Sequence, residues 1–268
     1  MVIDSHVHLQ TDPGYLDSLM ETVDRMGIDR IVLFGAWPEF DRFASNDQIL
    51  EAHQAYPQTI IPFYTFRLGE ESPDVLERVR KDGFRGLKLI NPPANYNDER
   101  FFPVWERCES LGLVTLFHTG IVSRNPQQVH YDLDTSRMKV IYLDRIARKF
   151  QKMTMFVAHL GNPDYGEACM MARWHANMYF DLSGSTLKKK SPDFFREMLW
   201  WGRQKIRYTD ELGRGPWAKI LYGTDVTPAE MEETRQDYLD LFDALELKEE
   251  QRAAVMGGTA AGLLGLNE

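Results

Sequence analysis

The sequence predicts an α/β protein folded as a (β/α)8 TIM barrel, with a single domain spanning residues 1–268. Short apolar runs alternate with segments of helical periodicity eight times, which is typical of right-handed βαβ units and a parallel sheet. Five expected helices open with a capping residue followed by proline, at positions 12, 72, 162, 191 and 227. We see no linker or low-complexity tract between them. A doubly wound open sheet is the alternative architecture.

The individual elements follow from changes in hydrophobic period. After the apolar run 2–9, Leu16, Leu19 and Val23 recur at helical spacing, and Gly27 ends the helix. The expected strands are 2–9, 30–36, 60–65, 84–90, 113–118, 153–159, 178–182 and 220–225. Helices are expected near 12–27, 45–56, 72–83 and 99–111, before residue 150, after residues 162, 191 and 227, and in two short segments at the end.

The composition is that of a globular protein with an acidic surface. Of the 268 residues, 43% are hydrophobic and 26% charged, and the net charge is −9. A nucleic-acid-binding surface needs an excess of Lys and Arg, so this charge argues against nucleic acid as the main partner. The lysine run 188–190 is expected to be a solvated loop face. A small molecule is the expected partner, and a homo-oligomer is left open.

The chain carries no sign of a membrane or secreted protein. No apolar run approaches membrane-spanning length, and we expect no signal peptide before the first strand. Cys108 and Cys169 both lie in helix-like stretches, which indicates a reducing compartment without a disulfide framework. The expected location is the cytoplasm.

Polar side chains gather at the C-terminal ends of the expected strands. In a barrel these ends meet on one face, where active sites are built. On a strand, residues two apart share a face, so alternation predicts that His6 and His8 project together. It also predicts that His159 shares a face with Met155 and Val157. The residues at the strand ends are His6, His8, Lys88, His118, His159 and Asp225.

The residue types on this face are those of a metal site. Imidazole nitrogens and carboxylate oxygens are the donors that zinc prefers. A charged group facing a barrel interior is costly unless a metal, a partner or water satisfies it. We therefore predict a metal held by His6, His8, His118 and Asp225. The remaining histidines are given no such role: His53 and His175 lie on expected helices, and His130 lies in a loop.

Five short motifs follow one another along the expected strands. They are Asp4-Ser5-His6-Val7-His8, Gly86-Leu87-Lys88-Leu89, Leu116-Phe117-His118, Ala158-His159-Leu160-Gly161 and Leu221-Tyr222-Gly223-Thr224-Asp225. In this order they resemble the amidohydrolase superfamily. More closely, the chain resembles the amidohydrolase-2 branch of metal-dependent hydrolases, which includes the aminocarboxymuconate-semialdehyde decarboxylase-like enzymes. The resemblance covers nearly all residues, and the segment 258–266 is similar to the helix that ends many of these chains.

The resemblance implies one metal ion, usually Zn²⁺, held by His6, His8, His118 and Asp225. Mn²⁺ or another divalent ion is left open. An open coordination position would lower the pKa of a bound water to about 7 and polarise a carbonyl group. In this scheme Asp225 takes the proton from the water, and His159 orients the substrate or stabilises developing oxyanion charge. Asp225 and His159 are thus the predicted catalytic residues.

Lys88 admits two interpretations. In some members of the superfamily a lysine on the fourth strand is carbamylated and bridges two metals. An unmodified Lys88 would instead pair with a substrate carboxylate or offset the charge of Asp225. We favour one metal and an unmodified lysine, because the closest resemblance is to single-metal members and a lysine amine is cationic at neutral pH. TatD-type nucleases share the histidine pattern but place glutamate at this position.

The loops after the strands are expected to set substrate specificity. Arginines near a metal indicate an anionic substrate that carries a carboxylate. Asp181 and Ser183, at the end of the seventh strand, are also expected near the pocket. The predicted substrate-binding residues are Lys88, Trp37, Tyr64, Arg67 and Arg124.

The predicted function is a metal-dependent hydrolase that cleaves a C–O or C–N bond of a small molecule. The alternative is a zinc-dependent nonoxidative decarboxylase, a carboxy-lyase using the same ligands. Related decarboxylases are generally longer, so the short chain favours hydrolysis. A noncatalytic barrel would be expected to show a damaged ligand set, whereas here the set is complete.

Overall fold

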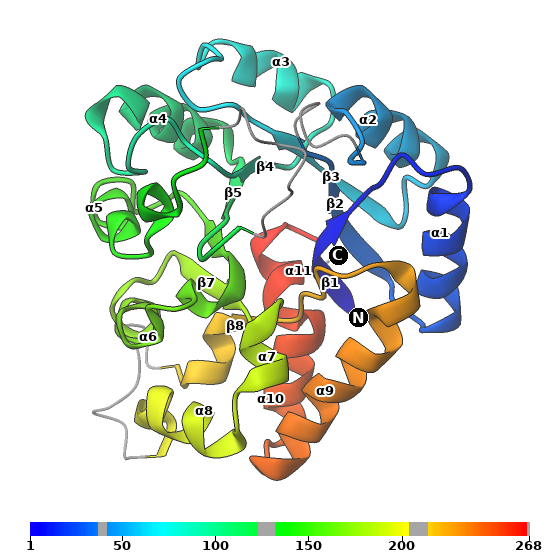
Figure 1. Ribbon diagram of the computed structural model, residues 1–268, viewed down its shortest axis with the longest axis vertical. Helices are drawn as coiled ribbons and strands as arrows, with labels where there is room; N and C mark the ends of the chain where they lie inside the picture. Colours follow the sequence, from blue (N-terminus) through cyan, green and yellow to red (C-terminus); the bar gives the residue numbers. More distant parts are fainter. Residues whose placement is uncertain (37–41, 123–131, 204–213, 267–268) are drawn as a thin grey trace.

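The computed structural model describes residues 1–36, 42–122, 132–203 and 214–266, and its eight strands form one parallel sheet (Figure 1). Each strand pairs with the next strand in the sequence. The strands are β1 (Ile3–His8), β2 (Arg30–Phe34), β3 (Ile60–Thr65), β4 (Gly86–Leu89), β5 (Val114–Phe117), β6 (Met155–Val157), β7 (Met178–Asp181) and β8 (Ile220–Leu221).

The first and last strands lie side by side and bring the sheet round into a barrel. Ser5 N donates a hydrogen bond to Tyr222 O at 2.9 Å, and Asp225 N donates one to His6 O at 2.8 Å. A doubly wound open sheet has no such contact between its outermost strands. The predicted TIM barrel is therefore confirmed.

Helices surround the barrel on its outer side (Figure 1). No helix in the described part of the chain is both long and apolar enough to cross a membrane. The helices are α1 (Tyr15–Arg25), α2 (Asn46–Ala55), α3 (Val75–Lys81), α4 (Phe102–Leu111), α5 (Tyr142–Lys149), α6 (Tyr165–Trp174), α7 (Ser185–Lys189), α8 (Pro192–Met198), α9 (Met231–Ala244), α10 (Glu249–Ala253) and α11 (Thr259–Leu263).

Two of the five predicted helix starts are confirmed. Ser191 accepts a hydrogen bond from Phe194 N at the start of α8. Thr227 and Glu230 form a capping box on the short 3₁₀ turn that leads into α9. The other three helices, α1, α3 and α6, begin two residues after the proline, which lies in the preceding turn.

Side chains alternate along the strands between two apolar layers. Phe34, Phe63 and Leu116 belong to the inner cluster that fills the barrel. A larger outer cluster packs the strands against the helices. Ala260 of α11 joins the inner cluster beside Ile3, at the start of β1, so the C-terminal helix closes the end of the barrel where the strands begin. The opposite end, where the strands finish, carries the polar residues.

Candidate metal centre and active site

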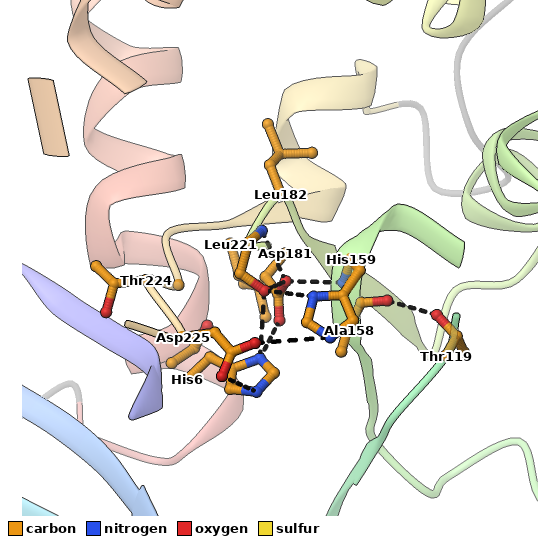
Figure 2. A network of polar contacts seen from close by, with 12 residues as sticks. His6, Thr119, Ala158, His159, Asp181, Leu182, Leu221, Thr224 and Asp225 are labelled. Atoms are coloured by element: carbon orange, nitrogen blue, oxygen red, sulfur yellow. Dashed lines mark hydrogen bonds and ion pairs between the residues drawn. The ribbon is translucent and has the colours of Figure 1, made fainter. Parts of the chain in front are cut away.

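Five side chains predicted from the strand ends meet at one end of the barrel. Asp225 Oδ1 lies 3.5 Å from Nε2 of both His6 and His8, and Asp225 Oδ2 lies 3.7 Å from Nε2 of His159. Figure 2 shows His6, His159 and Asp225 pointing toward one another, and their ligand atoms all lie within 4.8 Å. The rings of His118 and His159 are 5.0 Å apart. The strand ends thus converge as the sequence predicts.

An irregularity in β1 turns both of its histidines into the barrel. Ile3 belongs to the inner cluster and Val7 to the outer one, although strict alternation would place them on the same face. The pairing of β1 with β2 slips between Asp4 and Val7, which explains the change of face. The rings of His6 and His8 therefore both lie beside Phe34, with ring centroids 5.3 and 4.5 Å from the centroid of the Phe34 ring.

His159 reaches the cluster by a route that alternation does not predict. β6 ends at Val157, which faces the outer layer together with Met155, whereas Ala158 faces inward. Alternation would direct His159 outward, so the prediction that it shares a face with Met155 and Val157 is wrong. His159 instead adopts a left-handed backbone conformation, with φ of 63°, and this turn directs its side chain into the barrel.

Two histidines are oriented by hydrogen bonds from Nδ1, the ring nitrogen that faces away from Asp225, to groups that only accept hydrogen bonds. His6 Nδ1 lies 2.9 Å from Asp181 Oδ2, and His8 Nδ1 lies 3.2 Å from the carbonyl oxygen of Gly35. Each Nδ1 therefore carries the ring proton, and each Nε2 turns a lone pair toward Asp225. Such support behind a histidine is common at metal ligands.

Burial sets the charge state of the cluster. It lowers the pKa of His8, His118 and His159 below the usual 6.5, so these rings are neutral at neutral pH. Burial alone would raise the pKa of Asp225. Positive charge on His6, His159, His8 and Lys88, present at the acidic pH where Asp225 titrates, outweighs burial and holds the pKa of Asp225 below its usual range. A carboxylate thus faces several nitrogen lone pairs.

This arrangement fits a divalent metal ion. Lone pairs and a carboxylate that face one another repel unless a cation lies between them. Ligand atoms around a tetrahedral zinc are about 3.3 Å apart, close to the 3.5 Å that separates Asp225 Oδ1 from His6 and His8. His118 Nε2 is buried and has no hydrogen-bond partner among the described residues, as expected of a nitrogen that binds a metal.

Lys88 adds a cation to the edge of the cluster. Its Nζ lies 3.0 Å from His6 Nε2 and 4.6 Å above the ring of Phe34, and the residue is 1% exposed. Burial lowers the pKa of Lys88 to about 8, against the opposing charges of Asp225 and Asp181. Lys88 is therefore mostly protonated at pH 7.

Asp4 ties β1 to the loop that carries Asp225. Its carboxylate accepts hydrogen bonds from Thr224 N at 3.0 Å, Thr224 Oγ1 at 2.6 Å and His6 N at 3.1 Å. Between these segments, a Cβ added to Gly223 would lie 3.0 Å from Asp181 and 3.1 Å from His6, so only glycine fits without displacement. Asp4 was expected only as part of its motif, and Asp181 was expected near the pocket but not as the partner of His6.

The Asp4→Asn variant tests this contact through the pH dependence of stability. Burial raises the pKa of Asp4 from 3.8 to about 7. The folded protein therefore holds a proton that the unfolded chain releases between these values, and wild-type stability falls as pH rises through this window. Asparagine keeps the three contacts, because the Thr224 hydroxyl can reverse its direction, but it does not titrate. Between pH 5 and pH 8 the free energy of unfolding of the variant should increase by on the order of 2 kcal/mol relative to that of wild type.

Urea unfolding of both proteins in the presence of a chelator measures this difference. The histidines with lowered pKa titrate in both proteins, so their contribution cancels in the comparison. Parallel pH profiles for wild type and variant would show that Asp4 is not protonated in the fold.

Apart from Lys88, the predicted substrate-binding residues are not shown to lie at the histidine cluster. Tyr64 packs in the outer layer, where its ring contacts Phe84 at 5.3 Å and its hydroxyl donates to Glu71. Strand alternation turns it away from the barrel interior, and Tyr64 is therefore not part of the proposed site. Arg67 forms an ion pair with Glu70 at 3.1 Å. Trp37, Arg124 and His130 lie outside the described residues.

Solved structures of other proteins share this fold. An uncharacterised TIM-barrel protein from Bordetella bronchiseptica aligns with a TM-score of 0.75 and 18% identity over 98% of each chain. A dihydroxybenzoic acid decarboxylase from a Polaromonas species, with bound manganese, aligns with a TM-score of 0.66 and 17% identity over 100% of this chain and 97% of that chain. A probable 2-pyrone-4,6-dicarboxylic acid hydrolase from Acinetobacter baumannii aligns with a TM-score of 0.64 and 16% identity over 98% of this chain and 99% of that chain.

At these identities the structural likeness concerns the fold alone. No curated protein sequence matches the chain. A family model described as amidohydrolase matches residues 3–266, which include all five strand-end motifs. Because this match covers nearly the whole chain, the protein belongs to the amidohydrolase-2 family.

Proposed function

We propose that this protein is a metal-dependent hydrolase that cleaves a C–O or C–N bond of a small, carboxylate-bearing molecule. The observation that carries the proposal is the position of Asp225, an ionised carboxylate surrounded by the Nε2 atoms of His6, His8 and His159 at 3.5 to 3.7 Å. A bound divalent cation would acidify a water molecule and polarise the substrate carbonyl.

The chain's own residues supply the remaining chemistry. Asp225 is placed to accept the proton of the attacking water, since its lowered pKa keeps it ionised. His159, beside Asp225, orients the substrate or stabilises developing negative charge. Lys88 is the cation that a substrate carboxylate would meet at this end of the barrel. We assign the metal to His6, His8, His118 and Asp225, as one Zn²⁺ with Lys88 unmodified.

Decarboxylation is the second candidate reaction. It is favoured by the likeness to the manganese-containing dihydroxybenzoic acid decarboxylase. The alignment covers 97% of that decarboxylase. Hydrolysis remains our first proposal because the site gathers proton acceptors, whereas decarboxylation needs a group that protonates the substrate carbon from which carbon dioxide leaves.

We also propose that the protein acts in the cytoplasm on small molecules. Cys108 and Cys169 are both buried free thiols, as expected in a reducing compartment. The net charge of −9 does not favour a nucleic-acid partner.

Metal analysis and two product assays test the proposal. The purified protein is stripped with a chelator, reloaded with Zn²⁺ or Mn²⁺ and analysed by plasma mass spectrometry, and we expect one ion per chain. Carboxylate-bearing lactones, esters and amides are then screened for metal-dependent hydrolysis, and aromatic and muconate-like acids for release of carbon dioxide. Carbon dioxide release without hydrolysis would establish the second candidate. Two ions per chain with a carbamate carbon-13 signal would overturn the single-metal assignment.

A further inference from the structure

We infer that Ser183 is a positioning residue that fixes the tautomer of His159, with the ring proton on Nδ1 and a lone pair on Nε2. His159 Nδ1 lies 2.8 Å from the hydroxyl oxygen of Ser183. Unlike a carbonyl or a carboxylate, a hydroxyl can donate or accept, so this contact alone leaves the tautomer of His159 open. The hydrogen bonds of Asp181 decide it.

Asp181 uses its two carboxylate oxygens on different partners. Oδ1 accepts hydrogen bonds from Ser183 Oγ at 2.5 Å, Ser183 N at 3.0 Å and His159 N at 2.9 Å. Oδ2 accepts from His6 Nδ1 at 2.9 Å. Because two backbone N–H groups donate to Oδ1, this oxygen carries no proton and only accepts. Figure 2 shows Asp181 between His6 and His159.

The single hydroxyl proton of Ser183 must therefore point to Asp181. If it pointed to His159, two oxygens 2.5 Å apart would face each other with no hydrogen between them. With this proton committed, Ser183 Oγ can only accept from His159, which requires a proton on Nδ1. Gly184 packs closely against the same nitrogen, because a Cβ added at this glycine would lie 3.1 Å from His159 Nδ1.

One carboxylate thus orients two histidines of the cluster. Asp181 holds His6 directly and His159 through Ser183, and both rings turn Nε2 lone pairs toward Asp225. In the resting protein Nε2 of His159 then accepts a proton or binds a metal. Stabilising negative charge, one of the two roles proposed for His159, would require this nitrogen first to take up a proton. The catalytic meaning of this state rests on the proposed function, whereas the tautomer itself is a property of the metal-free chain.

Nitrogen-15 NMR of histidine-labelled, metal-free protein tests the inference directly. At a pH where the ring is neutral, the His159 signals, assigned by their loss in His159→Gln, should show a protonated Nδ1 and an unprotonated Nε2. In Ser183→Ala the Nδ1 proton loses its acceptor, while Asp225 Oδ2 lies 3.7 Å from Nε2. We expect the proton to move to Nε2, which exchanges the two chemical-shift types.

Two further variants serve as controls. Ser183→Thr keeps the hydroxyl and should keep the wild-type tautomer. Thr119→Val removes another buried hydroxyl, which donates to Ala158 O at 2.6 Å beside His159, and should leave the ring signals unchanged. A proton on Nε2 in the wild type, or an unchanged tautomer in Ser183→Ala, would overturn the inference. Because neither measurement uses a metal or a substrate, a failed hydrolysis screen would bear on the proposed function alone.

Discussion

Replacing Asp225 by asparagine should lower kcat/KM for hydrolysis by about 10²- to 10⁴-fold, the range expected when a positioned proton acceptor is lost. The variant also loses an anionic metal ligand, so we expect the metal content of the isolated protein to fall with it. Asparagine suits this test because Asp225 has a left-handed backbone, with φ of 51°, which asparagine also adopts readily. The fold should therefore remain intact. Steady-state kinetics and plasma mass spectrometry measure the two effects.

The matched control is Asp17→Asn on the exposed side of α1. It removes the same charge far from the cluster and should change neither the kinetics nor the metal content. Full activity in Asp225→Asn with a bound metal would remove Asp225 from the proton-transfer step. Activity that disappears while the metal stays bound would separate its proton-acceptor role from its ligand role.

The Lys88→Met variant should raise KM for a carboxylate-bearing substrate by about 10- to 100-fold, the cost of losing one hydrogen bond to a charged group. Methionine keeps a long unbranched side chain beside Phe34 and leaves one metal per chain in place. Because the pKa of Lys88 is about 8, wild-type KM should rise above pH 8, where the amine becomes neutral. The variant should lack this rise. Kinetics between pH 6 and pH 9 measure both effects.

Lys219 supplies a matched comparison. It is also fully buried, but its amine donates to His175 O and Ala176 O away from the cluster. Lys219→Met should lower the free energy of unfolding while the KM of the folded enzyme stays unchanged. A loss of bound metal in Lys88→Met, on the other hand, would indicate that Lys88 itself carries a metal as a carbamate.

The barrel and the residues of its site could be predicted because they depend on chain order. Parallel strands joined by helices bring their C-terminal ends to one face, so His118 and Lys88 could be placed there from the sequence. The path of His159 could not, since it depends on a left-handed turn after β6 that overrides alternation. His6 and His8 were expected together, but the slip of register in β1 that turns them inward has no evident signal in the sequence.

The supporting hydrogen bonds were harder to foresee than the ligands. Asp181 lies 175 residues from His6 in the sequence, and Asp4 lies 220 residues from Thr224. No local pattern connects residues so far apart. One signal was present: an aspartate that ends an apolar strand faces the same end of the barrel as the histidines. Tyr64 shows the opposite error: its position at the end of β3 predicts a substrate-binding residue, but its side chain faces outward.

The seam where β1 meets β8 divides the site between the two ends of the chain. During synthesis, His6 and His8 leave the ribosome more than two hundred residues before Asp225, so neither has this carboxylate beside it until β8 docks. A nascent chain that ends before Asp225 therefore lacks one of the four proposed metal ligands. We expect metal affinity to increase when β1 and β8 close the ring.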